Sequence, residues 1–590
     1  MIVPTEPAAS WMNRDFRPRI SFRWACLLAA PLLLFPFSAA HAQSNQELAE
    51  LRARDPHRFK LGSDCALCHS NSYRAVAMRD GNQKGIAPFD LWQSSMMANS
   101  SRDPFWKAVV SAEVAATPSL KPVIEEKCTR CHAPMAGSQR TSPDGEVLAF
   151  LKGDSEQAKQ GQDGVSCTVC HQITDEELGL ASSFTGHFHI GTNDQIFGPH
   201  KGPVTMPMQR HVGYTPTYSD HILESSLCAT CHTLLTTSVD PSGKPTVETP
   251  SPDGNFHEQA PYLEWRNSVF NTEVAKPNKQ ARSCQSCHVP TTDSQGNKIA
   301  TRLAHNPGGR DFPFLRDRDP FGRHTFVGSN TLLLQILRDN REALGVVASE
   351  KAFDRTLAET REFLGNKTAS IHFDPGSRRN NANQLALKIQ NLAGHKLPTA
   401  YPSRRMWIHL IVHNAKGDIV YRSGAYNESG QLVDQVGNVL PSELADGPLL
   451  RHQSKITNPD QPQVYESIMA DAAGQPTFTL LRGAAYVKDN RILPLGWSDS
   501  DDYAETLAPA GVEEDGDFIG GSDTVLYEPN LPAGRYQATA TLYFQVISPR
   551  HADELFQHNT EEVRQFKNFY QAADRKPEAL ATDSLKFIVK

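Results

Sequence analysis

The sequence predicts an α+β, multidomain protein in which a mostly helical or irregular N-terminal half precedes a β-sandwich-like C-terminal domain. Two observations lead to this prediction. All but one of the 11 cysteines lie between positions 65 and 287, in short clusters within loop-rich sequence. From about residue 370 the apolar pattern changes from the helical period to a period of two, and cysteine no longer occurs.

The first 42 residues have the organisation of a secretory signal peptide. Basic residues between Arg14 and Arg23 precede an apolar run at 24–37, and Ala40 and Ala42 form a cleavage site of small residues. The apolar run is too short to span a bilayer, so we expect a cleaved leader rather than an anchor. We therefore expect a mature chain without a membrane span, in the periplasm or, alternatively, outside the cell.

The net charge of the chain limits the classes of partner that it is expected to bind. The net charge is −7, and removing residues 1–42 takes away four arginines and two acidic residues, which leaves −9. An acidic protein is repelled by nucleic acids and by anionic membrane surfaces, so neither is an expected partner. An acidic surface is compatible with docking to a basic redox partner.

Ten cysteines form five copies of one motif, Cys-x-x-Cys-His, where chance would give on the order of 0.01 copies. Two thiols three positions apart add to the vinyl groups of one heme, and the imidazole that follows binds the iron as proximal ligand. We therefore expect five covalently bound hemes c. The cysteines are Cys65, Cys68, Cys128, Cys131, Cys167, Cys170, Cys228, Cys231, Cys284 and Cys287, and the histidines are His69, His132, His171, His232 and His288.

Three other uses of cysteine fit this pattern less well. A disulfide framework does not require a histidine after every second cysteine. Structural zinc sites combine Cys-x-x-Cys units into sets of four ligands, and a thioredoxin-like motif occurs singly within a βαβ unit. Heme attachment also agrees with the predicted export, because c-type heme is attached on the exported side of a bacterial membrane.

The motifs define a multiheme cytochrome c domain at 43–328, in which heme faces replace much of an ordinary apolar core. Within it, apolar spacing predicts a helix at 104–127 that leads to the second motif. A helical connector is expected at 329–368, with one helix ending at Gly345 and another at Gly365.

Residues 369–590 are predicted to form the β-sandwich-like domain. Strands are expected at 385–389, 406–412, 419–421, 534–544 and 585–589, with a hairpin turn at 414–418 and a helix near 559–572. The domain contains no cysteine and therefore no heme of its own. The acidic, glycine-rich run at 513–522 is expected to be a surface loop, with calcium binding as a less favoured alternative.

The chain resembles bacterial periplasmic multiheme cytochromes c in which a heme-rich N-terminal half precedes a β-sandwich with a Gly-His-x-x-Pro-Thr motif. The matching stretches are "SMMANSSRDPFWKA", "CTRCHAPM", "DGVSCTVCHQI", "LCATCHTL", "EQAPYLEW", "CQSCHVP", "GHKLPTAYPSRR" and "VKDNRILP", spread from about residue 90 to 500. The resemblance implies electron transfer, and the five motifs carry over residue by residue. Related cytochromes often have Ser-Met-His where this chain has Ser95, Met96 and Met97, which leaves the distal ligand of one heme open.

Each heme iron has a sixth position, for which residues near the motifs are candidates. His221 lies seven residues before Cys228, and His324 lies just before the helix expected at 332–344. His189 alternates with His187, so only one of them is expected to point inward. Met96 as ligand would raise the potential of its heme relative to two histidines, although packing in the core explains it equally well. Further candidates are His57, His187, His211, Met97, Met206 and Met208.

His395, in the stretch "NLAGHKLPTA", is a candidate ligand from the half without cysteine. Gly394 permits close approach of the backbone, and Pro398 biases Leu397 towards an extended conformation. The loop lies between two predicted strands, at one edge of the sandwich. From there His395 is predicted to reach a heme of the N-terminal half as distal ligand, the alternative being a loop histidine hydrogen-bonded to its neighbours.

These features predict a periplasmic pentaheme c-type cytochrome that transfers electrons between redox partners through covalently bound hemes. The expected partners are other cytochromes or a membrane quinol-oxidising complex. The alternative is a multiheme oxidoreductase, such as a reductase of a small nitrogen or sulfur oxyanion, with one open-coordination heme. All five motifs end in histidine, whereas pentaheme nitrite reductases mark their catalytic heme with lysine. The pattern favours a carrier, and no catalytic residue is assigned.

Overall fold

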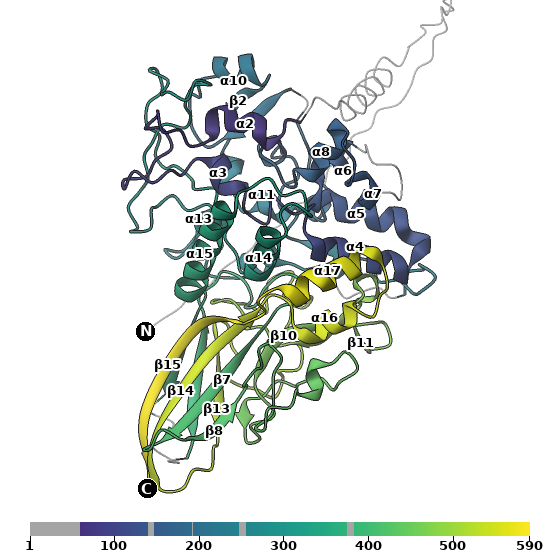
Figure 1. The fold of residues 1–590 in the computed structure, drawn as a ribbon, viewed down its shortest axis with the longest axis vertical. Coiled ribbons are helices and arrows are strands. Elements are labelled where there is room, and N and C mark those ends of the chain that lie inside the picture. Colours follow the sequence, from purple (N-terminus) through teal and green to yellow (C-terminus); the bar gives the residue numbers. More distant parts are fainter. Residues whose placement is uncertain (1–58, 140–146, 192, 247–254, 375–382) are drawn as a thin grey trace, which may run out of the picture. The chain divides into compact units, whose positions relative to one another are not determined.

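The computed structural model describes residues 59–139, 147–191, 193–246, 255–374 and 383–590. The predicted signal peptide and His57 lie outside the described residues. A helical, loop-rich N-terminal region is followed by a β-rich C-terminal region with several sheets, which confirms the predicted fold class (Figure 1). The described residues all belong to one unit.

Short helices joined by loops make up the N-terminal region. A motif needs only one helical turn to bring its two cysteines to one side, so short helices suffice for heme attachment. No helix in the described part of the chain is long and apolar enough to cross a bilayer. The helices are α2 (Gly62–His69), α3 (Pro88–Trp92), α4 (Pro104–Ala116), α5 (Lys121–His132), α6 (Pro134–Gln139), α7 (Val147–Phe150), α8 (Glu156–Gln162), α9 (Cys167–Cys170), α10 (Met206–His211), α11 (Ser226–Ala229), α12 (Pro261–Arg266) and α13 (Cys284–His288).

Two small sheets lie among these helices. One is parallel and consists of β1 (Gln195–Gly198) and β2 (Thr215–Tyr218). The other is antiparallel and consists of β3 (Leu234–Thr236) and β4 (Phe256–Gln259). β3 begins two residues after His232, so the second sheet lies directly beside the fourth motif.

The single helix predicted at 104–127 is divided in two in the structure. Asp103 caps the start of α4 by accepting a hydrogen bond from the backbone N of Phe105, and the helix ends at Ala116. A 3-10 turn at Pro118–Leu120 separates it from α5. Proline has no backbone N–H and disfavours helical backbone in the residue before it, so the helix ends before Pro118 although the apolar pattern continues.

The predicted helical connector contains two helices, α14 (Thr331–Asp339) and α15 (Glu350–Lys367). Each begins with a side-chain cap, from Asn330 and Ser349 respectively. α14 ends before Gly345, which lies in the turn between the helices at a positive φ of 64°. α15 continues through Gly365, so the expected stop at that glycine is wrong.

Two sheets face each other in the C-terminal region. The larger has the order β11-β10-β7-β14-β15, with β8 beside β7 and β12 beside β10, and the smaller has the order β5-β6-β13-β9. Leu387 and Val525 of the smaller sheet and Leu410 and Ala540 of the larger belong to one buried core. The strands are β5 (Ala369–Asp374), β6 (Leu385–Asn391), β7 (Arg405–Asn414), β8 (Ile419–Ser423), β9 (Lys455–Ile456), β10 (Val464–Ala470), β11 (Pro476–Thr477), β12 (Ala485–Asp489), β13 (Ser522–Tyr527), β14 (Gly534–Gln545) and β15 (Glu578–Val589).

Two C-terminal helices, α16 (Pro549–Leu555) and α17 (Glu561–Ala572), join this core to the N-terminal region. Phe566 of α17 lies 5.2 Å from Phe105 of α4, measured between ring centroids. Ser111 of α4 and Thr560 at the start of α17 share a hydrogen bond of 2.7 Å. Figure 1 shows α4 and α17 side by side. Burying one phenylalanine contributes roughly 2–3 kcal/mol, so the shared core holds the two regions together.

Candidate heme-binding sites

The ten motif cysteines all lie in the described part of the chain, and each has a free thiol. In a heme-loaded protein these sulfur atoms are thioethers bound to the edge of the porphyrin. Nine of the ten are partly buried, and Cys287 of the fifth motif is exposed. The fifth attachment site therefore lies nearest to solvent.

Thiols of different motifs contact one another at three places. Each contact raises the pKa of one thiol well above its usual value, and burial raises it further. A weaker electrostatic interaction between Cys170 and Cys231 connects the third motif with the fourth. The five motifs therefore form one connected set. The hydrogen-bonded thiols are Cys65 and Cys167 of motifs one and three, Cys131 and Cys231 of motifs two and four, and Cys228 and Cys284 of motifs four and five.

Four of the five motif histidines are oriented by backbone carbonyl groups. Because a carbonyl only accepts, Nδ1 carries the proton and Nε2 keeps its lone pair for a metal. Burial lowers the pKa of all five, which favours the neutral ring that binds iron. The residues present therefore fit heme c. The Nδ1 contacts are His69 to Leu303 at 3.0 Å, His132 to Ser100 at 3.4 Å, His171 to Phe197 at 2.6 Å and His288 to Val327 at 2.7 Å.

His324 lies opposite the third motif histidine, His171. The ring centroids are 6.2 Å apart, and the ring planes differ by 25°. Two imidazoles bound to one metal, each through a bond of about 2 Å, have centroids roughly 6 Å apart. Nδ1 of His324 donates to the carbonyl of Gly322 at 3.0 Å, so its Nε2 is also available. The spacing is that of two histidines that share one iron.

The ring of His395 is oriented like that of His324, with Nδ1 towards a backbone carbonyl, and it lies near the fourth and fifth motifs. Its Nδ1 donates to the carbonyl of Lys396 at 3.0 Å, and burial lowers the pKa of the ring. The ring interacts electrostatically with His232 and His288. Gly394 allows this approach, because a Cβ there would lie 3.0 Å from the Trp265 ring of the N-terminal region.

A buried network of charges fixes the loop at 391–400. Lys396 is fully buried, and its Nζ lies 2.6 Å from Oδ2 of Asp489. Arg491 binds Asp489 at 2.7 Å and Glu264 of α12 at 2.9 Å. Glu264 in turn accepts a hydrogen bond from the backbone N of Lys396. The network therefore ties the loop to a helix of the N-terminal region.

Arg404 is a partly buried cation that forms no ion pair with any described residue. Its guanidinium donates to the carbonyl of Thr399 at 2.7 Å. Burial lowers its pKa to about 10, so it remains charged at neutral pH. It interacts electrostatically with His232 and His395. Heme carries two propionate groups, and a carboxylate at this place would balance the charge.

The other predicted iron ligands have different surroundings. His221 is buried, with Nδ1 2.6 Å from Oγ of Ser219 and Nε2 2.8 Å from the carbonyl of Ile173, so both ring nitrogens are already engaged. His189 is exposed beside two glutamates. Met96 packs against the core of the two large sheets. This geometry does not favour His221 as a ligand, and all of these assignments stay predictions.

Sequence reasoning missed His305, which has the same orientation as the motif histidines. Its Nδ1 lies 2.7 Å from the carbonyl of Asn306, and its Nε2 is buried without a hydrogen-bond partner among the described residues. Its backbone N donates to the carbonyl of Cys68, so it lies beside the first motif. In the sequence, a turn that contains proline follows both histidines: Asn-Pro-Gly after His305 and Lys-Leu-Pro after His395. This shared feature could have marked His305 as a candidate ligand.

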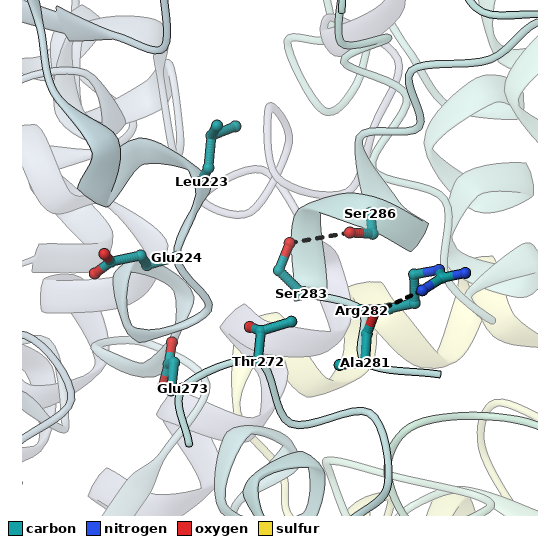
Figure 2. Close-up of a pocket in the computed structure, with 8 residues that line it drawn as sticks. All are labelled: Leu223, Glu224, Thr272, Glu273, Ala281, Arg282, Ser283 and Ser286. Atoms are coloured by element: carbon teal, nitrogen blue, oxygen red, sulfur yellow. Dashed lines mark hydrogen bonds between the residues drawn. The ribbon is translucent and has the colours of Figure 1, made fainter. Parts of the chain in front are cut away.

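A cavity of about 530 Å³ opens between the fourth and fifth motifs (Figure 2). Glu224 and Glu273 line one side and Ser283 and Ser286 the other. Glu273 is held by the backbone N of Ser226 at 2.8 Å and by the hydroxyl of Tyr262 at 2.7 Å. The serines flank Cys284, so the cavity lies beside the fifth attachment site.

Comparison with known proteins agrees with the motif chemistry. Residues 64–172, which contain the first three motifs, match the family described as cytochrome c554 and c-prime. This region is therefore similar to a multiheme cytochrome c, a class of protein that binds heme c covalently through Cys-x-x-Cys-His motifs. A penta-heme cytochrome c552 from Thermochromatium tepidum is similar in structure, with 15% sequence identity and a TM-score of 0.47 over 90% of this chain and 100% of that chain. No curated protein matches the sequence.

Proposed function

We propose that this protein is a periplasmic pentaheme c-type cytochrome that carries electrons between redox partners. Heme c supplies reversible one-electron oxidation at its iron when bound. The observation that carries the proposal is the set of three thiol contacts, which link motif one with motif three and motif four with motifs two and five. An electrostatic interaction between Cys170 and Cys231 links the two groups. Because each sulfur marks the edge of one attached heme, neighbouring sulfurs bring the edges of neighbouring hemes together.

The proposed iron ligands follow from the orientation of the rings. The five motif histidines are proximal ligands, with Nδ1 held by the backbone in four of them. His324 is the distal partner of His171, because the two rings have the spacing of a shared metal. His395 is the distal ligand at the fourth or fifth motif, where it interacts with both proximal histidines.

The proposed location and partners rest on different parts of the chain. The signal peptide predicted at residues 1–42 supports export to the periplasm. Other cytochromes or a membrane quinol-oxidising complex are the proposed partners, and the acidic charge favours a basic docking surface on them.

Heme content and spin state test the proposal on the exported protein. A pyridine hemochrome assay is expected to give five hemes per chain, and fewer would contradict the pentaheme assignment. In the oxidised protein, His324→Ala is expected to convert one low-spin heme to high-spin in EPR and magnetic circular dichroism. His221→Ala is the matched control and is expected to leave the number of high-spin hemes unchanged. An unaltered spectrum for His324→Ala would refute the assignment of that ligand.

One observation favours a second candidate function, an oxidoreductase with an open coordination position at the second motif. The hydroxyl of Tyr401 and Oε1 of Glu258 are buried without hydrogen-bond partners among the described residues, and both groups interact with Cys128. Unpartnered polar groups beside a heme attachment site are suited to binding a small polar ligand. A high-spin heme that binds nitrite or cyanide, with an affinity altered by Tyr401→Phe, would support this function over the carrier.

A further inference from the structure

An acidic cluster lies outside the heme region, where the loop at 511–521 meets β13. A ring nitrogen of His452 and carboxylate oxygens of Asp515 and Asp523 all lie within 4.8 Å of one another. Asp517 lies beside them: its backbone N donates to Oδ1 of Asp515 at 3.1 Å, and its own Oδ1 accepts from the backbone N of Thr524 at 3.3 Å. These residues come from three separate segments, so the fold, rather than a local turn, brings them together.

Asp523 provides an independent indication that the cluster binds a ligand. Its side chain is fully buried, and its Oδ2 accepts a hydrogen bond from the hydroxyl of Tyr465 at 2.6 Å. Its Oδ1 is buried without a hydrogen-bond partner among the described residues. The side chain of Asp515 is 5% exposed, and neither aspartate forms an ion pair with a lysine or arginine in the described part of the chain. Two buried carboxylates without a cation are unfavourable, and a bound cation removes this penalty.

The hydrogen bonds of His452 decide which kind of cation fits. Its Nδ1 accepts from Nε2 of Gln463 at 2.7 Å, and Oε1 of Gln463 is itself held by the backbone N of Gln453 at 2.7 Å. The side-chain amide of Gln463 cannot flip without losing its hydrogen bond from Gln453, so its NH2 group faces Nδ1 of His452. Nδ1 therefore accepts, and the proton of His452 is on Nε2. Nε2 donates it to Oδ2 of Asp515 at 2.8 Å. Structural zinc sites are built mainly from cysteine sulfur and histidine nitrogen, and this nitrogen carries a proton, whereas calcium is bound by oxygen atoms.

We propose that Asp515, Asp517 and Asp523 bind a calcium ion, and that His452 orients Asp515 by donating a hydrogen bond from Nε2. The site is distinct from the heme chemistry. It fixes the loop at 511–521 against β13. Ala510, the residue just before this loop, pairs with the backbone of Asp489, so calcium stabilises the strand end that holds the buried charge network.

The test uses the full-length, heme-loaded protein after removal of metal with a chelator. Isothermal titration with calcium chloride is expected to show one ion per chain with a Kd below about 1 mM. Saturating calcium is expected to raise the melting temperature by at least about 2 °C. Magnesium chloride and zinc chloride, added separately, are expected to give smaller shifts, because the site offers large, oxygen-only coordination.

Matched variants separate the proposal from its alternatives. Asp523→Asn is expected to weaken calcium binding at least about tenfold, and Asp517→Asn, at the exposed rim, serves if that variant does not fold. Glu514→Gln, an exposed neighbour in the same loop, is expected to leave binding unchanged. His452→Gln keeps an N–H donor near Asp515 and is expected to weaken calcium binding less than about threefold.

Two results would overturn the proposal. One is the absence of any calcium response in the unaltered protein, which would mean that Asp515 and Asp523 share a proton only. The other is a preference for zinc that is lost in His452→Gln, which would make His452 a metal ligand.

Discussion

Replacing Asp489 by asparagine measures what the buried charge network contributes to stability. Its Oδ2 lies 2.6 Å from Nζ of Lys396 and 2.7 Å from Nη2 of Arg491, so one oxygen serves two cations. Glu264 supplies the other carboxylate of the network. Asp489→Asn keeps the size of the side chain but leaves two buried cations with one carboxylate.

The expected loss follows from the burial of the pair. The side chains of Lys396 and Asp489 are 0% and 1% exposed, so water cannot replace the missing carboxylate. Breaking a buried ion pair from one side costs about 3–5 kcal/mol. We therefore expect Asp489→Asn to lower the free energy of unfolding at pH 7 by about 3–5 kcal/mol.

The effect is also expected to depend on pH. Burial opposes ionisation of Asp489, but Arg491 and Lys396 outweigh it and lower the pKa of the carboxyl below its ordinary value. A carboxyl with a depressed folded-state pKa stabilises the fold above its unfolded-state pKa, near 4, and this contribution is lost as the pH falls through the folded-state value. The difference between the variant and the unaltered protein is therefore expected to shrink below about pH 4.

Urea unfolding followed by far-UV circular dichroism measures the change. Asp354→Asn is the matched control, because Asp354 and Arg338 form an ion pair of 2.9 Å whose side chains are 54% and 27% exposed. An exposed pair contributes less than about 1 kcal/mol. Equal losses in the two variants would refute the conclusion that the buried network stabilises the loop of His395.

Three further predictions concern other parts of the molecule. Burial lowers the pKa of His551 to about 3, so the protein loses stability as the pH falls from about 6.5 towards 3. His551→Phe is expected to remove this loss and to gain up to about 2 kcal/mol at pH 5, and an equal change in melting temperature at pH 5 and pH 8 would contradict it. Arg404→Gln is expected to lower the potential of one heme by about 40–60 mV in a redox titration, because a neighbouring cation favours the reduced state. Unchanged potentials would show that Arg404 does not lie close to a heme. Gly186 has a φ of 77°, and a Cβ there would lie 2.6 Å from the side chain of Arg130 and 3.2 Å from the sulfur of Cys131. Gly186→Ala is expected to reduce heme attachment at the second motif, measured by the mass of the peptide that contains Cys131. Full attachment would show that the backbone can shift to accommodate the added Cβ.

The strands of the C-terminal region could be predicted well because each buries one face in a shared core. The predictions of 406–412 and 534–544 correspond to β7 (Arg405–Asn414) and β14 (Gly534–Gln545). The helices were harder to delimit. Apolar spacing continues across Pro118, although the backbone of proline stops the helix there. Gly365 predicted the end of a helix, but α15 continues to Lys367.

The motif residues could be identified from sequence because heme attachment needs a fixed local spacing. The contacts between motifs could not, since Cys65 and Cys167 meet only when distant segments fold together. The same holds for the network of Glu264 and Asp489, in which Glu264 and Arg491 are 227 positions apart in the sequence. Ring orientation is likewise invisible in the sequence, which shows neither that both ring nitrogens of His221 are engaged nor that Nδ1 of His305 lies against a backbone carbonyl.

The thiol contacts between motifs have a consequence for the order of biosynthesis. In the folded chain, the sulfur atoms of Cys131 and Cys231, and those of two other cysteine pairs, are close enough to hydrogen bond. In an oxidising compartment, neighbouring thiols are substrates for disulfide formation. A chain that folded first would expose six of its ten attachment sulfurs to cross-linking between motifs. We therefore expect heme attachment to precede folding, with the attachment machinery acting on an open chain.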